Sequence, residues 1–529
     1  MAGQVAPAHS LRDDYWEEFQ VDSGDIEFLY NHLLEVETPQ TPEQLVAALI
    51  RERVRREEKS LKEKRSAGGQ IYIPAGRYNP GEVLVFPAFD WQHAQVVGTR
   101  KGINPQLEDF DVIQVDFGSD EIREFASGLE DHRLNQPPDS QSGGSEGELS
   151  ILLDEYGGRL SAVLLEELGT NPDFVYIAGR WFPRALVIEI NEGHLNLAEA
   201  VLDMAGGGPL DTKYLIEQIG IQAGSNPNLL EFSLDLALQE DTRFDEVGPS
   251  GEVLWYLKKL EPKEVLQTPA LLREQKVDFD RASLSSEMAT LESELGDELS
   301  QIHSEGPYPS EVRVPLIFPH WHSGTLPISA KMQGIFPTAY DAPRIQIQFI
   351  DAEGRGSFPG WVVRSAAYVY GLKDWYLEKG LMPGSLVRVG KGSRPGEVKI
   401  STEGHTSARE YVRTALVGSD GGIVFAHLKQ TVTAAIDDRM VISVPDPNAL
   451  AEVWQKVKDS RIPFEKTVVD MFRELAKLTA QSHVHAIELY AAVNLVRRTP
   501  PGAIFALLES RPWFDHLGDF YFRMSDSEG

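Results

Sequence analysis

Residues 243–257 read RFDEVGPSGEVLWYL, and a related phrase, WFDHLGDFYFRM, occupies residues 513–524. The pattern Phe-Asp-x-(Val or Leu)-Gly begins at Phe244 and again at Phe514, 270 residues later. Each copy runs into a short segment rich in aromatic residues, Val253–Leu257 or Phe520–Met524. The repeat predicts that one local structure occurs twice in this chain.

The residues before each phrase also match at the same offset. Leu234 and Leu238 precede the first copy, and Ile504 and Leu508 precede the second. Their spacing of four places each pair on one face of a helix. The expected order is therefore a helix, a tight glycine turn and a β-hairpin. The phenylalanine of each phrase should fill the core beneath the hairpin, and the glycine should supply the positive φ of the turn.

This pattern resembles the winged helix-turn-helix modules of the delta subunit of bacterial RNA polymerase and of related helix-turn-helix domains in chromatin and restriction proteins. The Trp-x-Leu ending of those modules is present as Trp255-Tyr256-Leu257, whereas the second copy has Phe522-Arg523-Met524. The resemblance implies a module that contacts DNA or docks onto a protein.

The two copies differ in the charge of the helix that would read DNA. In the first copy this helix spans residues 227–241 and has no Lys or Arg, and its acidic residues are Glu231, Asp235, Glu240 and Asp241. Negative charge opposes entry into a DNA groove, so protein docking or a structural role is expected there. The second copy has basic and amide side chains at its helix-turn, and its candidate nucleic-acid contacts are Asn494, Arg497 and Arg498.

Residues 311–415 form a basic island in an acidic chain. They contain thirteen Lys and Arg against nine Asp and Glu, a net charge of +4 within a total of −31. A local reversal of charge is the expected mark of a nucleic-acid surface on an acidic protein. The alternative is a structural barrel with ordinary surface charges.

Residues 360–392 within the island read GWVVRSAAYVYGLKDWYLEKGLMPGSLVRVGKG. We expect a strand to Arg364, a short helix with Trp375 and Tyr376 turned inward, and a strand from Ser385 to Val389. This order resembles the DNA-binding pseudobarrel of plant B-three domains and of restriction-enzyme effector domains. The resemblance implies DNA contacts at Arg355, Arg364, Lys391, Arg394 and Lys399.

Composition limits the class of protein. The chain has 529 residues, more than one hydrophobic core can organise, and no cysteine. Neither a secretory signal nor an apolar run long enough to span a bilayer is visible. We therefore expect a cytoplasmic, α+β multi-domain protein with winged helix-turn-helix-like units and small β-barrels.

The expected domain boundaries follow shifts in composition. They are an N-terminal helical unit plus small β-barrel at 1–133, an acidic flexible linker at 134–148, a winged-helix-like domain at 149–262, a connecting helix at 263–310, a pseudobarrel-like β domain at 311–415, and a C-terminal α/β domain ending in a second winged-helix-like unit at 416–529. The charged run at residues 51–65 is expected to be a solvated helix face.

The sequence offers no constellation for catalysis. Neither a phosphate-binding loop nor a nucleophile elbow is present. The pairs His320 with His322 and His483 with His485 have the spacing of metal ligands on one face of a strand, but each pair has no third ligand nearby in sequence. We therefore predict a protein that is not an enzyme and has no cofactor and no metal.

Two functions remain open from the sequence. The first is a DNA-binding protein of transcription regulation, or an accessory subunit, that uses the 311–415 barrel and the C-terminal winged helix. The second is an acidic scaffold that docks onto a protein partner such as RNA polymerase, or a helicase or nuclease of a defence complex. The sequence leaves the choice between DNA and RNA, the target and the oligomeric state open.

Overall fold

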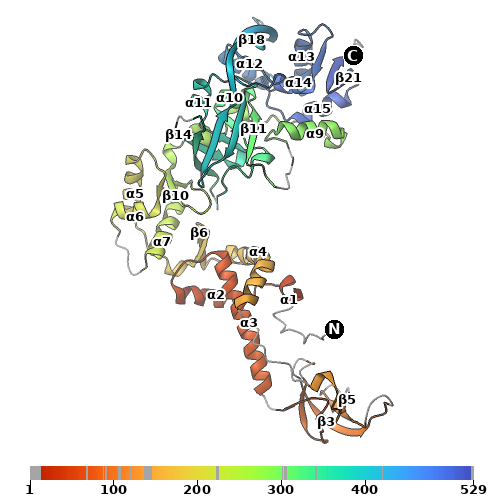
Figure 1. Ribbon diagram of the computed structural model, residues 1–529. Coiled ribbons are helices and arrows are strands. Elements are labelled where there is room, and N and C mark those ends of the chain that lie inside the picture. The colour runs from red at the N-terminus through yellow and green to blue at the C-terminus, as the bar shows by residue number, and fades with distance from the viewer. Residues whose placement is uncertain are drawn as a thin grey trace. The chain divides into compact units, whose positions relative to one another are not determined.

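The computed structural model describes residues 13–66, 69–86, 89, 92–104, 109–118, 122–135, 146–221, 226–300, 302, 307–339, 342–353, 356–419 and 421–525. It confirms the expected mixed α+β class, with several separate sheets (Figure 1). The chain divides into two compact units: residues 1–188 with 224–232, and residues 189–223 with 233–529. No helix in the described part of the chain is long and apolar enough to cross a membrane.

The first unit begins with helices, as the sequence predicts. They are α1 (Asp13–Glu17), α2 (Ser23–Val36) and α3 (Pro42–Ser66). A capping box starts α3, because Thr41 Oγ1 accepts from the Gln44 N–H at 3.4 Å while Gln44 Oε1 accepts from the Thr41 N–H at 2.9 Å. Pro42 occupies the first helical position, where its missing N–H costs nothing.

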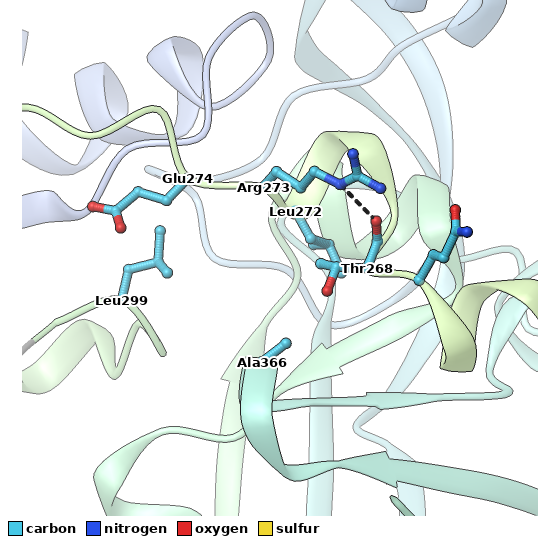
Figure 2. A pocket seen from close by; sticks show the side chains of 7 residues that line it. Thr268, Leu272, Arg273, Glu274, Leu299 and Ala366 are labelled. Carbon is cyan, nitrogen blue, oxygen red and sulfur yellow. Dashed lines mark hydrogen bonds between the residues drawn. The ribbon is translucent and has the colours of Figure 1, made fainter. Parts of the chain in front are cut away.

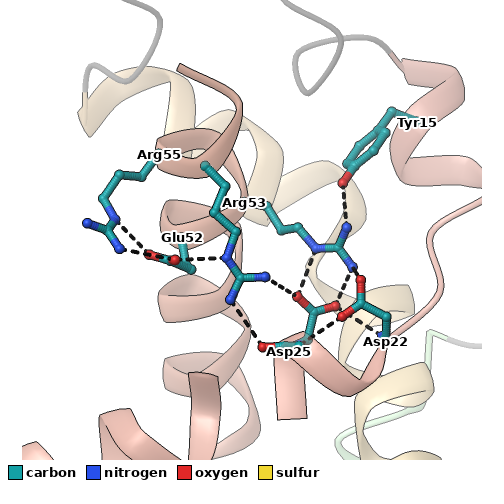
Figure 3. Close-up of polar contacts among 8 residues, drawn as sticks. Tyr15, Asp22, Asp25, Glu52, Arg53 and Arg55 are labelled. Carbon is teal, nitrogen blue, oxygen red and sulfur yellow. Dashed lines mark hydrogen bonds and ion pairs between the residues drawn. The ribbon is translucent and has the colours of Figure 1, made fainter. Parts of the chain in front are cut away.

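The charged run in α3 is partly structural and not merely solvated (Figure 3). Arg53 forms ion pairs with Asp22, at 2.8 Å, and with the completely buried Asp25, and so fixes the start of α2 against α3. Glu52 accepts from Arg55 at 2.7 Å and from Arg56 at 2.8 Å, and these bonds lower the pKa of Glu52.

A five-stranded sheet interrupts the helical part of this unit. Its strands are β1 (Gln70–Ile71), β2 (Val83–Phe86), β3 (Gln92–Lys101), β4 (Asp111–Asp116) and β5 (Ile122–Ser127), in the order β1-β2-β3-β4-β5. The helical turn η3 (Arg133–Asn135) follows it. Tyr72, Phe86 and Phe125 pack together in the core, with ring centroids 4.6–5.4 Å apart. The strands of the small β-barrel predicted within residues 1–133 are therefore present.

The chain then returns to the helical part through α4 (Glu146–Thr170), β6 (Phe174–Ile177) and β7 (Arg180–Pro183), followed by η4 (Arg184–Leu186). α4 contacts α3, and Gln40, just before α3, forms an antiparallel bridge with Trp181 of β7. Most of the predicted linker, residues 136–145, lies outside the described residues, and α4 begins inside its range.

The second unit starts with α5 (Glu192–Met204), β8 (Leu210–Asp211) and α6 (Thr212–Ile219). It continues with the later part of α7 (Pro227–Glu240), then β9 (Phe244–Glu246) and β10 (Leu254–Leu257), in the sheet order β8-β10-β9. Leu234, Leu238 and Phe244 are buried in its core with Trp255. The predicted helix, turn and hairpin are present here.

The C-terminal region repeats this arrangement. After α12 (Pro447–Asp459) come α13 (Phe464–Ala476), β20 (His483–His485), α14 (Ala486–Val493), α15 (Pro501–Ser510), β21 (Phe514–Gly518) and β22 (Tyr521–Met524), in the sheet order β20-β22-β21. Ile504, Leu508 and Phe514 are buried, as predicted.

The first unit contains a third example of the same element order. In chain order it has helix α2, the bridge at Gln40, helices α3 and α4, and the hairpin β6–β7. The other two examples have a helix, a strand, two helices and a hairpin in the same order. The sheet of residues 70–127 is inserted between α3 and α4. We call the three copies modules A (residues 23–66 and 146–183), B (192–257) and C (464–524). Residues 149–188 therefore lie in the first unit, whereas the composition predicts one domain from residue 149 to residue 262.

The two glycines of the repeated phrase, Gly248 and Gly518, are required for different structural reasons. Gly518 has φ of +99°, as predicted, but Gly248 does not have a positive φ. A Cβ on Gly248 would lie 1.9 Å from the Glu252 carbonyl oxygen, so close approach of the backbone requires glycine there. The positive φ in this turn belongs to Gly251.

A segment of short helices joins module B to the next sheet. It contains η5 (Lys258–Leu260), α8 (Lys263–Leu266), η6 (Ala270–Leu272), η7 (Arg281–Ser283) and α9 (Ser286–Leu295). The sequence predicts a helix from Leu284 to Ile302, but α9 ends at Leu295. Gly296 adopts φ of +63° there and terminates the helix.

Residues 311–402 form a seven-stranded sheet shaped as a half-barrel, in the order β11-β16-β17-β13-β14-β15-β12. Val387, Val398 and Ile400 lie in its core, and Trp375 and Tyr376 are buried as predicted. The elements in chain order are β11 (Glu311–Pro315), α10 (Phe318–Ser323), β12 (Thr325–Pro327), η8 (Ala330–Met332), β13 (Arg344–Asp351), β14 (Ser357–Val363), η9 (Arg364–Ala366), β15 (Tyr368–Tyr370), α11 (Lys373–Glu378), β16 (Leu386–Lys391) and β17 (Glu397–Thr402).

The half-barrel continues into a long two-stranded ribbon, β18 (Gly404–Val417) with β19 (Ile423–Ala434). The predicted boundary at 415/416 therefore falls inside β18. The ribbon joins the half-barrel at its base, where Leu386 N–H donates to Ala435 O at 2.9 Å. Near its tip, Ala415, Ile423 and Phe425 are buried in the core of the C-terminal region.

Candidate nucleic-acid interface

The β16–β17 turn presents three of the predicted DNA contacts to solvent. Lys391 ends β16, Arg394 lies in the turn, and Lys399 lies on β17 between the buried residues Val398 and Ile400. Alternation along β17 therefore directs Lys399 to the outer face of the sheet.

One carboxylate in this turn is occupied by the backbone. Glu397 Oε2 accepts from the Ser393 N–H at 3.2 Å and from the Arg394 N–H at 3.1 Å. A Cβ on Gly392 would lie 2.4 Å from the Glu397 carbonyl oxygen, so the turn closes tightly on Glu397. The carboxylate thus holds the turn and forms no ion pair with Lys391, Arg394 or Lys399 among the described contacts.

Other cations of the basic island are neutralised within the protein. Arg313 and Arg388 pair with Glu403 at 2.7 and 2.8 Å, and Lys379 pairs with Asp351 at 3.1 Å. Arg344 pairs with Asp245, and Arg413 pairs with Glu488 at 2.7 Å. No ion-pair partner among the described residues is found for four of the five DNA contacts predicted in this island: Arg364, Lys391, Arg394 and Lys399.

Arg364 lies at the same end of β13 as the β16–β17 turn. Arg364 directly follows β14, and the last residue of β14, Val363, pairs with Arg344 at the start of β13. The turn also contacts β13, because the Gln348 N–H donates to Gly396 O at 2.9 Å. The Arg364 side chain is exposed and donates to Ala339 O at 3.2 Å. Arg355, the remaining predicted contact of this island, lies outside the described residues.

The hairpin of module B lies at this same edge of the half-barrel. Gln346 donates its N–H to Val247 O at 2.9 Å, and Ser250 donates its N–H to Thr338 O at 2.6 Å. The exposed Glu252 in this hairpin adds a negative charge near the cationic turn. The edge is therefore locally basic but not uniformly so.

The predicted contacts of module C are buried. Arg498 has no exposed surface, and its Nη2 pairs with Asp297 at 2.6 Å and with Glu298 at 2.7 Å. Asn494 Oδ1 accepts from Arg498 Nη1 at 3.0 Å. Arg497 donates to Ile462 O at 3.1 Å and stacks over Phe464. A DNA backbone cannot reach side chains held in this way, so Asn494, Arg497 and Arg498 are left out of the interface.

The buried charges of this cluster stabilise one another. The carboxylates of Asp297 and Glu298 hold the pKa of Arg498 well above its usual value despite burial, and Arg498 with His320 holds the pKa of Glu298 well below its usual range. Burial together with the adjacent Asp297 raises the pKa of Tyr490, whose hydroxyl donates to Asp297. The cluster is a structural ion network in which Arg498 stays charged.

The third helix of each module is unsuited to reading DNA. α15 of module C is buried from Pro501 to Leu508. α7 of module B is largely buried between Leu230 and Leu238, and its acidic residue Asp235 is buried too. α4 of module A has an exposed face, but the charges on it are mostly acidic, at Asp154, Glu155, Glu166 and Glu167. A recognition helix needs exposed donors and positive charge. The described residues of these three helices offer a single exposed cation, Arg159 of α4, which lies among the acidic residues named above.

One histidine of each His-x-His pair, His320 or His485, has a structural role. His320 lies on α10 and not on a strand, and its ring nitrogens lie 2.8 Å from Thr325 Oγ1 and 3.1 Å from Glu298 Oε1. His485 caps the start of α14, and burial together with Arg439 lowers the pKa of His485 to about 4. Within the described residues, no three His, Asp or Glu side chains gather as ligands for a metal.

An open groove of about 500 Å³ lies where the segment before α9 passes the half-barrel (Figure 2). Its lining includes Thr268, Leu272, Arg273, Leu299 and Ala366. Arg273 Nε donates to Thr268 O at 2.9 Å. The charged side chains of the lining are Arg273 and Glu274.

Comparison of the chain with models of protein families, with curated proteins and with solved structures finds no match. The case for a function therefore depends on the geometry and charge of the residues themselves.

Proposed function

We propose that this chain is a non-catalytic nucleic-acid-binding protein that holds duplex DNA at the edge of the half-barrel formed by the β16–β17 turn. Lys391, Arg394 and Lys399 contact phosphates, and Arg364 extends the same edge. A role in transcription regulation, or as an accessory subunit of a DNA-processing complex, follows from this activity.

The proposal depends on one observation: several cations of the half-barrel region form ion pairs within the protein, whereas those at the β16–β17 turn do not. Glu403 pairs with Arg313 and Arg388, Asp351 pairs with Lys379, and Glu397 is held by backbone N–H groups. The cations at the turn are therefore available to an external anion. Phosphate contacts dominate the affinity for DNA, so such cations are suited to this ligand even when the whole chain is acidic.

The modules take structural or docking roles in this proposal. Their shared order of helices and strands, with the third strand between the other two, supports a winged-helix assignment for modules A, B and C. Buried or acidic third helices favour protein contacts over groove reading. The hairpin of module B, which bonds to the half-barrel at Gln346 and Thr338, then supports the DNA-binding edge.

The experiment is binding of a labelled DNA duplex to the full chain, measured by fluorescence anisotropy. The test variant is Lys391→Glu with Arg394→Glu and Lys399→Glu. The matched control changes three exposed lysines of the same unit, Lys263→Glu, Lys276→Glu and Lys466→Glu, and so alters net charge equally. Loss of binding in the test variant alone supports the site, whereas equal binding by both variants rejects it.

A second function is favoured by a separate observation. The exposed acidic face of α4 and the net charge of −31 suit a basic protein surface, as in a scaffold docking onto RNA polymerase or onto a helicase or nuclease. A chain that captures such a partner but binds no duplex at low salt would favour this function over DNA binding.

A further inference from the structure

The β18–β19 ribbon changes the face that it buries half-way along its length. The register pairs Arg409 with Thr431, Tyr411 with Lys429 and Arg413 with His427, so these six residues share one face. In the half nearer the base this face is exposed at Arg409, Tyr411, His427, Lys429 and Thr431, while Val412 and Val432 of the opposite face are buried against Val441. In the half nearer the tip the first face is the buried one.

Tyr411 is the most exposed aromatic side chain in the described part of the chain, at 74%. No described aromatic ring stacks on it, and Lys429 Nζ lies 5.9 Å from its ring centroid. Burying a ring stabilises the fold, and this ring is left in water on a paired strand, so packing does not explain its position.

The cations around Tyr411 are also available. Arg409 and Lys429 are exposed and form no ion pair with a described carboxylate, and Arg409 lies on the same strand two residues from Tyr411. Glu410 points to the opposite face by strand alternation. Arg413 is paired with Glu488 and so takes no part.

A flat ring flanked by cations matches the chemistry of an unpaired nucleotide strand. Bases of a single strand stack on aromatic side chains while cations hold the phosphates, whereas the bases of a duplex are already stacked and hidden. An acidic peptide would use the cations alone and would gain little from the ring.

We propose that the ribbon face formed by Arg409, Tyr411 and Lys429 binds single-stranded nucleic acid, with one base stacked on Tyr411 and the adjacent phosphates held by the two cations. This inference extends the proposed function, with which it shares the ligand class but none of its residues.

The test measures binding of labelled oligothymidylate and of a labelled duplex to the full chain. Tyr411→Ala should weaken oligothymidylate binding by about tenfold, in line with the loss of one stacked base, and leave duplex binding unchanged. Tyr411→Phe keeps the ring and should bind as the unaltered chain does. Tyr214→Ala, which removes another exposed tyrosine, is the matched control and should have no effect.

The outcomes separate this inference from the proposed function. Oligothymidylate binding that is unaffected by Tyr411→Ala, or absent at low salt, overturns the inference. Displacement of the oligonucleotide by polyglutamate at equal charge concentration would show attraction by charge alone and would also overturn it. If the chain binds oligothymidylate through Tyr411 but binds no duplex, the proposed function fails and the inference stands. The same assay with oligouridylate shows whether the strand is DNA or RNA.

Discussion

Arg498 Nη2 lies 2.6 Å from Asp297 Oδ1, and neither side chain has any exposed surface. The two residues are 201 positions apart in the chain. Their pairing ties the segment after α9 to the turn between α14 and α15, and it explains why an arginine that resembles a DNA contact in sequence is structural.

Replacement of this arginine should strongly destabilise the protein. Arg498→Met leaves the buried Asp297 and Glu298 without their counter-charge, and removal of one partner of a buried ion pair costs about 3–5 kcal/mol. Urea unfolding followed by circular dichroism should show this loss. The control is Arg473→Met on α13, an exposed position where the change should stay within about 0.5 kcal/mol. Equal unfolding curves for the two variants would refute the structural role.

A buried hydrogen-bonded group should stabilise module B. Asp235 Oδ1 accepts from Trp255 Nε1 at 2.9 Å and from Thr212 Oγ1 at 2.5 Å. Asp235→Ala leaves two buried donors without this acceptor and should lower the free energy of unfolding by about 1–3 kcal/mol. Gln239→Ala, at an exposed position of the same helix, is the control. A stability equal to that of the control would show that the acceptor is not needed.

Stability should depend on pH through Glu261. Burial, followed by the nearby Asp245, raises the pKa of Glu261 to about 8, from 4.5. The folded state then keeps a proton that the unfolded state has released, so this group reduces stability as pH rises from 4.5 to 8. Glu261→Gln should remove that loss, and its stability relative to the unaltered chain should increase with pH and level off above 8. The exposed Glu274→Gln should show no such trend, and a parallel pair of pH profiles would contradict the assignment.

Replacement by alanine should lower stability at one glycine, Gly248, and raise it at another, Gly158. Gly248→Ala forces a Cβ against the Glu252 carbonyl oxygen, and such overpacking costs about 1–3 kcal/mol. Gly158→Ala, on the exposed face of α4 with no atom within 4 Å of the new Cβ, should stabilise the helix by about 0.4–1 kcal/mol. Thermal melting of both variants measures the two signs, and destabilisation by Gly158→Ala would show that α4 is not packed as described.

The sequence predicts helices and strands better than it predicts which side chains contact one another in the folded protein. The spacing of Leu234, Leu238 and Phe244 correctly predicts a helix and hairpin with a buried face, because local periodicity reports which side faces a core. The burial of Arg498 could not be predicted, because its partners lie about two hundred residues away and only the tertiary fold brings them together.

Module A was missed although its sequence contains a signal. Leu164, Leu168 and Phe174 precede Leu234, Leu238 and Phe244 by 70 residues each. The phrase at Phe174 lacks the Asp-x-x-Gly spacing of the other two, and the inserted sheet separates its helices. A search for the buried positions alone, without the glycine, would have found this copy.

The ribbon surface was missed for a different reason. The predicted domain boundary at 415/416 divides β18 and so assigns most of β18 and all of β19 to different domains. The pairing of Tyr411 with Lys429 follows from strand register, which residue composition does not contain.

The most direct test of the DNA-binding proposal is the salt dependence of duplex binding by the full chain. We compare the unaltered chain with the neutral variant Lys391→Gln, Arg394→Gln, Lys399→Gln, and plot the logarithm of the binding constant against the logarithm of salt concentration. If DNA binds at the β16–β17 turn, binding should weaken with salt, and the slope should be shallower by about three in the variant, since each lost phosphate contact removes about one unit. The absence of binding at low salt, or an identical slope for both proteins, would contradict binding at this turn.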